Sequence, residues 1–252
     1  MTKKGSVFIT GASSGFGEAC ARWYGERGYS LILAARRMER LEKLAGELSV
    51  PTHVIPMDVR DKKAVFQAVE ELPESFLDVE ILINNAGLAL GLAPSQDADL
   101  DDWETMVDTN IKGLLFLTRA LLPQMMKRPS AHIVNLGSVA GSWPYPGGNV
   151  YGATKSFVEQ FSRNLRCDLL GSGVRVTNIA PGLAETEFSL VRFKGEKDKA
   201  DAAYTGMKPL TAEDIAEIIG WVTLLPAHVN INHLEVMPVQ QAWNFFAVDR
   251  KK

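Results

Sequence analysis

The glycine-rich segment near the N-terminus constrains the fold of this chain more than any other feature. The short apolar run Val7-Phe-Ile9 has the residue types of a β-strand. The loop Gly11-x-x-x-Gly15-x-Gly17 follows it and opens a helix that reaches about Arg27. Glycines let a backbone approach a pyrophosphate closely, and the N-terminus of a helix favours its negative charge. A plain glycine-rich turn is the alternative, but the position between a strand and a helix favours phosphate binding.

Apolar runs alternate with helix-like segments along the rest of the chain. Further strands are predicted at 31–35, 53–57, 79–83, 132–136, 174–179 and 231–236. Such alternation is typical of a parallel sheet with helices on both faces. The chain has 252 residues and no linker, repeat or low-complexity segment. We therefore expect one domain over 1–252, with a Rossmann-like, doubly wound α/β fold of about seven strands.

The composition excludes several classes of function. The formal net charge of −3 gives no electrostatic reason to expect a nucleic-acid or acidic-membrane partner. No apolar run is long enough for a signal peptide or a membrane span. Cys20 and Cys167 have no pairing pattern, so we expect two buried thiols in a reducing, cytoplasmic compartment. The four histidines lack metal-ligand spacing, and no metal site is predicted.

A phenol and an ammonium lie four residues apart at Tyr151 and Lys155, in a segment with helical periodicity. Residues i and i+4 share one face of a helix. Ser138 follows the predicted strand 132–136, at the edge where such sheets hold their ligands. The pattern predicts proton transfer to or from an alcohol oxygen, with Ser138 bonded to that oxygen and Tyr151 as the acid or base.

Lys155 is expected to lower the pKa of Tyr151, because an unperturbed phenol has a pKa of about 10 and a neighbouring cation favours the phenolate. An oxidised nicotinamide ring would be a second positive charge. A chance Y-x-x-x-K pattern, with a half-buried tyrosine and a solvated lysine, is the alternative that the pair by itself leaves open.

Two arginines, Arg36 and Arg37, follow the predicted strand 31–35. In NAD-binding proteins of this fold an acidic residue at this position holds the ribose 2′-hydroxyl. Arginines that open a helix oppose its dipole, and a 2′-phosphate between them would remove that conflict. A solvated basic turn is the alternative, but the missing acid favours NADP(H) as the cofactor.

In combination, these motifs resemble those of the short-chain dehydrogenase/reductases, over a stretch from Ser6 to about Pro238. The motifs occur in order: Thr10-Gly-Ala-Ser-Ser-Gly-Phe-Gly17, Asn84-Asn-Ala-Gly87, Asn110, Ser138, Tyr151-x-x-x-Lys155 and Pro181-Gly182. Within the family the chain is most similar to the NADP-dependent serine / 3-hydroxy acid dehydrogenases, with sulfoacetaldehyde reductase as a near relative. That closer similarity lies in 87–91, 141–145, 147–151 and 191–195.

The resemblance implies a catalytic set and a cofactor site. Asn110, Ser138, Tyr151 and Lys155 would be catalytic, and Asn110 would interrupt a helix and hold a water that links Lys155 to solvent. Asp58 and Val59 would lie beside the adenine, and Thr186 or Glu187 would reach the cofactor amide. The cofactor residues would be Gly11, Ser13, Ser14, Gly15, Phe16, Gly17, Arg36, Arg37, Asp58, Val59, Asn85, Ala86, Gly87, Tyr151, Lys155, Pro181, Gly182 and Thr186.

The substrate is expected under a lid at 183–207, with a C-terminal tail at 240–252 that carries Phe245 and Phe246. Arg192 lies in the lid between apolar neighbours, and its guanidinium suits a carboxylate or a sulfonate. A solvated lid arginine is the alternative. Tyr145 is expected as a second contact, beside Ser138 and Tyr151, and the aromatic tail would close the pocket.

The resemblance implies an NADP(H)-dependent oxidoreductase that interconverts the alcohol and carbonyl of a small anionic substrate, a 3-hydroxy acid such as serine or 3-hydroxypropionate. Reduction of sulfoacetaldehyde to isethionate is the alternative. A non-catalytic NADP(H)-binding regulator is a third, which an intact proton relay disfavours. Excess apolar surface on 111–126 and on the helix after Tyr151 predicts a subunit interface, and the family implies a homotetramer.

Overall fold

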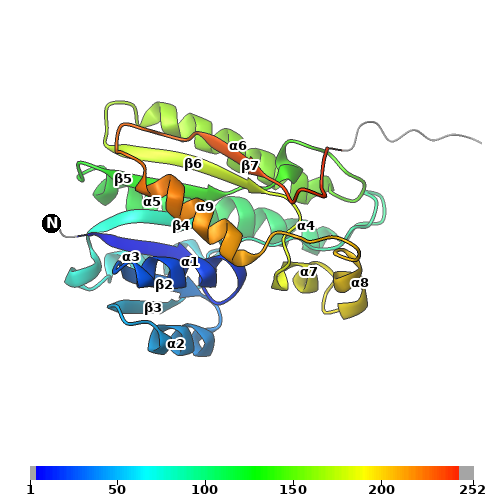
Figure 1. Cartoon of the computed structure of the whole chain (residues 1–252), viewed down its shortest axis with the longest axis horizontal. Helices are drawn as coiled ribbons and strands as arrows, with labels where there is room; N and C mark the ends of the chain where they lie inside the picture. The colour runs from blue at the N-terminus through cyan, green and yellow to red at the C-terminus, as the bar shows by residue number, and fades with distance from the viewer. Residues whose placement is uncertain (1–3, 244–252) are drawn as a thin grey trace, which may run out of the picture.

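One parallel sheet organises the molecule, and the computed structural model describes it over residues 4–243. The strand order is β3-β2-β1-β4-β5-β6-β7 (Figure 1). The strands are β1 Ser6–Thr10, β2 Ser30–Ala35, β3 Thr52–Pro56, β4 Val79–Asn84, β5 Ala131–Leu136, β6 Val174–Pro181 and β7 His233–Val236. The direction of strand addition reverses between β1 and β4, and ligands of such sheets bind at that point. The predicted doubly wound sheet is confirmed.

Helices cover both faces of the sheet (Figure 1). Side chains of α1 (Gly15–Glu26), α2 (Met38–Glu47) and α9 (Ala212–Leu224) share one hydrophobic cluster. Those of α3 (Lys62–Glu70), α5 (Leu114–Met125) and α6 (Asn149–Asp168) share another on the opposite face. The remaining elements are α4 Leu100–Val107, α7 Glu187–Arg192, α8 Lys197–Ala202, the 3₁₀ turns η1 Glu74–Phe76 and η3 Val139–Gly141, and the π-helical segment η2 Asp108–Gly113.

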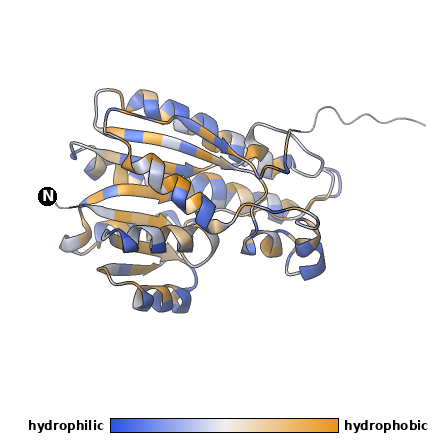
Figure 2. Ribbon diagram, in the orientation of Figure 1, coloured by the Kyte–Doolittle hydropathy of each residue, from blue (hydrophilic) through white to orange (hydrophobic). Residues whose placement is uncertain are grey.

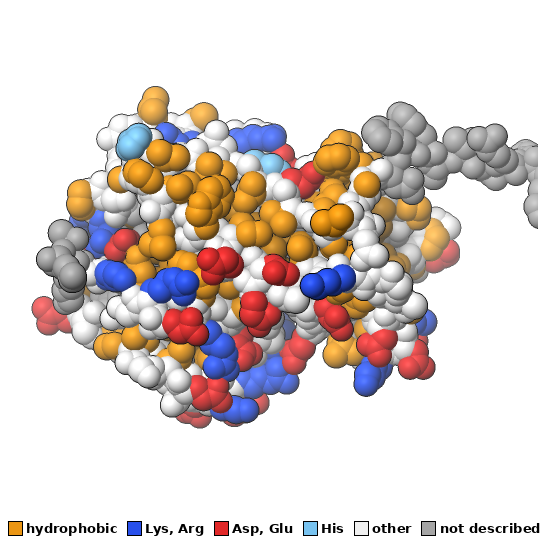
Figure 3. Space-filling view, viewed as in Figure 1, with side chains coloured by type: hydrophobic (Ala, Val, Ile, Leu, Met, Phe, Trp, Pro, Cys, Tyr) orange, Lys and Arg blue, Asp and Glu red, His pale blue; other side chains and the backbone are white. Residues whose placement is uncertain are grey.

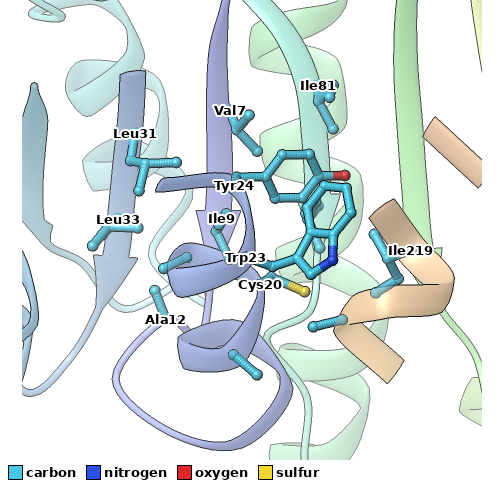
Figure 4. Close-up of a cluster of buried hydrophobic side chains, with 14 of the residues drawn as sticks. Val7, Ile9, Ala12, Cys20, Trp23, Tyr24, Leu31, Leu33, Ile81 and Ile219 are labelled. Carbon is cyan, nitrogen blue, oxygen red and sulfur yellow. The ribbon is translucent and has the colours of Figure 1, made fainter. Parts of the chain in front are cut away.

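The central strands supply both clusters because their alternate side chains point to opposite faces. Val7 and Ile9 of β1 lie in the cluster under α1 and α9, whereas Phe8 lies in the other. Figure 4 shows the first cluster, with Trp23 and Tyr24 of α1 beside Ile219 of α9. Burial on both faces explains why the hydrophobic colour predominates on these strands in Figure 2, although polar residues interrupt it.

Asparagine side chains connect the middle strands of the sheet at Asn84 and Asn85. The Asn84 amide donates to Asn135 Oδ1 at 2.9 Å and to Thr118 Oγ1 at 3.0 Å. The Asn85 amide donates to the Thr10 carbonyl at 2.8 Å, which joins β4 to the start of the glycine-rich loop. These bonds satisfy polar groups that would otherwise be costly to bury.

Helix boundaries follow local contacts. The helix α4 begins at Leu100, because Asp99 is its N-cap and accepts from Asp101 N at 2.9 Å. The helix expected over 111–126 is a π-helical turn followed by α5. A capping box starts α9, because Thr211 and Asp214 bond each other's backbone N–H groups.

The expectation of two buried thiols was wrong for one of them. Cys20 is buried under α9, but Cys167 is exposed near the end of α6. Both cysteines lie on helices, and helical periodicity by itself does not decide which way Cys167 faces.

Neither a membrane helix nor a metal cluster occurs in the described part of the chain. None of the helices within residues 4–243 is long and apolar enough to cross a bilayer. Over the same residues, no three His, Cys, Asp or Glu side chains gather closely enough to hold an ion.

Candidate active site and cofactor cleft

A cavity of about 660 Å³ lies at the carboxyl ends of the strands. It is lined by Ser138, Tyr145, Tyr151, Lys155 and Arg192, and by every predicted cofactor residue except Gly17. Residues from distant parts of the sequence reach this edge because all strands of the sheet are parallel.

The glycine-rich loop has the shape that a pyrophosphate needs. Gly11 has φ +64°, and a Cβ there would lie 2.8 Å from Asn85 Nδ2. Gly17 does not line the cavity, but a Cβ on it would lie 2.4 Å from the Gly11 carbonyl, so it allows α1 to pack against the loop. Ser14 precedes α1 without a side-chain capping bond, which leaves the first N–H groups of this helix for an anion.

The donors at the end of β2 fit a 2′-phosphate. Arg37 donates to Ser13 Oγ at 3.1 and 3.2 Å and to Ser14 Oγ at 2.8 Å, so its guanidinium lies against the glycine-rich loop. Arg36 is exposed at the cavity wall and has no ion-pair partner within residues 4–243. Two guanidiniums at one wall of a nucleotide-sized cavity match the chemistry of a phosphate dianion.

The segment after β6 brings Thr186 and Glu187 to the cavity. Thr186 lines the cavity and is the N-cap of α7, where its hydroxyl accepts from Phe188 N at 3.2 Å. The Glu187 carboxylate accepts from Arg37 at 2.9 Å. Contact of Thr186 or Glu187 with the cofactor amide stays a prediction.

Tyr151 is buried, with 8% of its surface exposed. Its ring lies 5.6 Å from the ring of Phe188. Burial raises its pKa to about 12, while a hydrogen bond with Ser138 and the charge of Arg192 act in the opposite direction. The predicted lowering of this pKa by Lys155 does not appear, because the cost of burying a phenolate outweighs the hydrogen bond with Ser138 and the charge of Arg192.

Lys155 is also buried, with 6% of its surface exposed. Its Nζ donates to the Leu136 carbonyl at 2.7 Å and lies 5.9 Å from the centre of the Tyr151 ring. Burial lowers its pKa to about 8. The ammonium therefore faces the cavity at a cost to folding, and the alternative of a solvated lysine does not apply.

Asn110 lies within η2, in keeping with the expectation that it interrupts a helix. Its amide donates to the Leu88 carbonyl at 2.8 Å and to Thr154 Oγ1 at 3.0 Å, and its Oδ1 accepts from Leu88 N at 2.8 Å. A Cβ on Gly87 would lie 3.2 Å from Asn110 Oδ1 and 3.4 Å from Lys155 Nζ. The glycine thus keeps an opening between the asparagine and the lysine.

Replacing Lys155 with Met is expected to stabilise the cofactor-free protein at pH 7 while it weakens cofactor binding and turnover. The unfolded lysine, with its pKa of 10.5, holds its proton up to a higher pH than the folded one, with a pKa of about 8. Lys155 therefore makes the free energy of unfolding of the wild type rise as the pH increases from about 8 to 10.5. At pH 7 the cost of burying its ammonium is present in full. Removing the charge should raise the free energy of unfolding by roughly 1–3 kcal/mol, since the lost bond to Leu136 offsets part of the gain.

Denaturant unfolding at pH 7 and pH 9.5 measures this effect, with Lys63→Met on the exposed surface of α3 as the control. The variant should lose part of the rise in stability between the two pH values. A Lys155→Met protein that is less stable than the wild type at pH 7 would contradict the prediction.

Sequence reasoning missed several residues at the cavity. Phe188 packs on Tyr151 and lies four residues before Arg192 in α7, a spacing that pattern reading could have used. Trp143 and Trp243 both donate to the Glu235 carboxylate, at 2.7 and 3.0 Å, and bring the start of the tail to the cavity mouth. The predicted contacts of Phe245 and Phe246 lie outside the described residues.

The chain is similar to several known proteins in sequence and in fold. A sequence model described as short chain dehydrogenase matches residues 5–197. Sulfoacetaldehyde reductase 2 of Chromohalobacter salexigens is 60% identical over 247 residues, which cover 97% of this chain and 98% of that protein. The NADP-dependent 3-hydroxy acid dehydrogenase YdfG of Escherichia coli K12 is 52% identical over 246 residues, with 97% and 99% covered. A structure of the closed form of serine dehydrogenase complexed with NADP+ has a TM-score of 0.96 at 52% identity, with 97% of this chain and 99% of that chain covered.

Proposed function

The chain belongs to the short-chain dehydrogenase family, and we propose that its cavity converts a small anionic alcohol to the matching carbonyl compound and back, with NADP(H). NADP(H) accepts or supplies the hydride when it is bound. In the oxidation direction Tyr151 takes the hydroxyl proton, Ser138 holds the substrate oxygen, and Lys155 with Asn110 returns the proton to solvent. Reduction reverses each transfer, with Tyr151 as the acid.

The position of Arg192 is the observation that supports an anionic substrate. Its Cζ lies 5.1 Å from the centre of the Tyr151 ring and 5.7 Å from that of Phe188. It donates a hydrogen bond to Tyr145 OH, and its Nε is buried without an acceptor among the described residues. A guanidinium with unused donor capacity beside the acid/base phenol suits an anion joined closely to the reacting carbon.

The first candidate is a 3-hydroxy acid such as serine or 3-hydroxypropionate. In these molecules one carbon separates the reacting carbon from the carboxylate. A substrate of this size can contact Tyr151 and Arg192 together, because both lie at one end of the cavity. The similarity to serine dehydrogenase and to the 3-hydroxy acid dehydrogenase supports this choice.

Sulfoacetaldehyde and isethionate are the second candidate pair. The same single carbon separates their reacting carbon from the sulfonate, so Arg192 could serve either anion. The 60% identity to a sulfoacetaldehyde reductase favours this alternative. Steady-state kinetics with L-serine, 3-hydroxypropionate, isethionate and sulfoacetaldehyde compares the two, by kcat/KM. A wild-type protein that binds NADP(H) but transfers no hydride with any of them or with other short-chain alcohols and aldehydes would favour the regulator alternative.

Replacing Arg192 with Ala is expected to raise KM for the anionic substrate by roughly 10–10²-fold, the size of a charge-assisted hydrogen bond. A neutral short-chain aldehyde should be little affected, because it offers no anion to the guanidinium. Lys197→Ala, which removes another cation from the predicted lid, is the matched control. Equal losses for anionic and neutral substrates would mean that Arg192 supports the shape of the lid and does not bind the anion.

We also propose that the chain forms one catalytic domain, with a lid at 183–207 and a tail from 240 onward that completes the pocket. The lid helices α7 and α8 are short, and Leu190 and Val191 of the lid are exposed. Gln241, Ala242 and Trp243 line the cavity, which supports a role for the tail. Deleting the chain from Trp243 should lower activity without loss of assembly.

A homotetramer in the cytoplasm is the proposed setting. Phe157 and Phe161 stack on α6, and Trp221 and Leu224 of α9 are 51% and 54% exposed. Figure 3 shows apolar side chains gathered over α9 and β7, on the face of the molecule that carries Trp221 and Leu224. Apolar patches of this kind support subunit contacts, which sedimentation measures directly. The two unpaired cysteines support a reducing compartment.

A further inference from the structure

The carboxylate of Glu187 joins the lid to the arginines that follow β2. Its Oε2 accepts from Arg37 Nη1 at 2.9 Å, and its Oε1 accepts from Arg40 Nη1 at 2.6 Å. The contact with Arg37 spans 150 residues of sequence. We call this pair of contacts the Glu187 bridge. It lies at the wall where Arg36 and Arg37 line the cavity.

In the Glu187 bridge, Arg37 donates through Nη1, which makes no hydrogen bond to the glycine-rich loop. Arg37 Nε bonds Ser13, and Nη2 bonds both Ser13 and Ser14, so Glu187 is the acceptor for Nη1. Although burial raises the pKa of Glu187, the hydrogen bonds from Arg40 and Arg37 bring it below its ordinary value. The carboxylate is therefore ionised at neutral pH and competes with any anion that approaches Nη1.

Charge balance indicates which anion that is. Four arginines (Arg36, Arg37, Arg40 and Arg60) and two carboxylates (Asp58 and Glu187) at this wall leave an excess of two positive charges. A phosphate monoester carries a charge of about −1.5 to −2 near neutral pH, which matches that excess. NAD(H) has no such phosphate and leaves the excess in place.

We propose that Glu187 discriminates between the two nicotinamide cofactors, because the 2′-phosphate of NADP(H) displaces its carboxylate from Arg37 and the 2′-hydroxyl of NAD(H) does not. The bridge to Arg40 then remains as the lid contact. The proposal rests on the placement of Arg37 at the 2′-phosphate.

The short helix α7 connects the Glu187 bridge to Arg192, at the end of the cavity where the substrate is proposed to bind. Glu187 is its first residue and Arg192 its last, about 8 Å apart along the axis. Arg192 is also held through its backbone, since its carbonyl accepts from Gly91 N at 2.9 Å, and Lys194 bonds Asp102 at 2.8 Å. Loss of the Arg37 contact therefore loosens the start of α7 while its end stays attached.

Glu187→Gln tests the competition, with Glu185→Gln as the matched control. Glu185 is exposed in the same segment and has no ion-pair partner among the described residues. Titration calorimetry with NADP+ should show roughly 1.5- to fivefold tighter binding to Glu187→Gln, the size of a partly exposed charge interaction. Binding of NAD+ should be unchanged, as should both affinities of the control. Unchanged or weaker NADP+ binding to Glu187→Gln would overturn the proposal.

A second measurement does not depend on affinity. Amide hydrogen exchange over 183–192 should be faster with 2′,5′-ADP bound than with ADP bound, because only the former carries the 2′-phosphate. That difference should vanish in Glu187→Gln. Equal exchange with both nucleotides in the wild type would overturn the proposal.

Arg37→Gln separates the two assumptions. If this variant keeps full NADP+ affinity, Arg37 does not meet the phosphate and the placement itself is wrong. If it loses NADP+ affinity while Glu187→Gln has no effect, the placement holds and the competition is excluded.

Discussion

Replacing Tyr151 with Phe is expected to lower kcat by roughly 10²–10⁴-fold, the usual contribution of a general acid or base. NADP(H) binding should remain nearly intact, because the phenyl ring keeps its contact with Phe188 and only the hydroxyl is lost. Stopped-flow or steady-state absorbance of the nicotinamide measures turnover, and calorimetry measures cofactor binding. Tyr29→Phe, which removes another largely buried phenol outside the cavity, is the control. Turnover near the wild-type value in Tyr151→Phe would exclude this residue as the acid or base.

The raised pKa of Tyr151 also sets the direction of the pH dependence. With a pKa of about 12 the hydroxyl is protonated at neutral pH, so it is ready to donate in the reduction direction. Oxidation needs the phenolate and should therefore speed up as the pH rises toward that pKa. The positive charge of a bound oxidised nicotinamide should lower the pKa of Tyr151, so the oxidation rate should rise at a lower pH. A pH profile for oxidation that falls with rising pH would contradict this account.

Replacing Arg36 and Arg37 together with Gln is expected to weaken NADP(H) binding by roughly 10²-fold, since hydrogen bonds to charged groups contribute about 1.5–3 kcal/mol each. NAD(H) binding should change much less, because it lacks the phosphate that these guanidiniums would meet. Arg37 also supports the glycine-rich loop through Ser13 and Ser14, and a small loss for both cofactors is expected from that contact.

Arg60→Gln is the matched control for these arginines. Arg60 lies near the same wall, but its guanidinium bonds Asp58 at 2.6 and 3.0 Å and does not line the cavity. Calorimetry with both cofactors on the wild type, the double variant and the control makes the comparison. A wild-type protein that prefers NAD(H) would show that the end of β2 had been interpreted wrongly.

Features that depend on local spacing could be predicted from the sequence. The apolar runs of the strands, the loop from Gly11 to Gly17, the i, i+4 pair of Tyr151 and Lys155 and the capping box of Thr211 and Asp214 each lie within a few residues of one another. Their geometry follows from backbone periodicity alone, and the structure places them accordingly.

Contacts between distant segments were decided by the tertiary structure. The Glu187 bridge, the bond from Arg192 to Tyr145 and the packing of Phe188 on Tyr151 depend on how the segment after β6 folds over the cavity. No local pattern encodes that placement, because the sheet order brings these residues together. For the same reason the sequence predicted Arg192 as a substrate contact but did not predict the contact of Glu187 with Arg37.

The pKa of Tyr151 shows the same division in a single residue. The sequence by itself determined that a phenol and an ammonium share one helical face, four residues apart. Only the tertiary structure decided how deeply both are buried, and burial raises the pKa of the phenol to about 12 while it lowers that of Lys155 to about 8. Spacing follows from the regular rise of a helix, whereas desolvation is summed over every element that packs around the site.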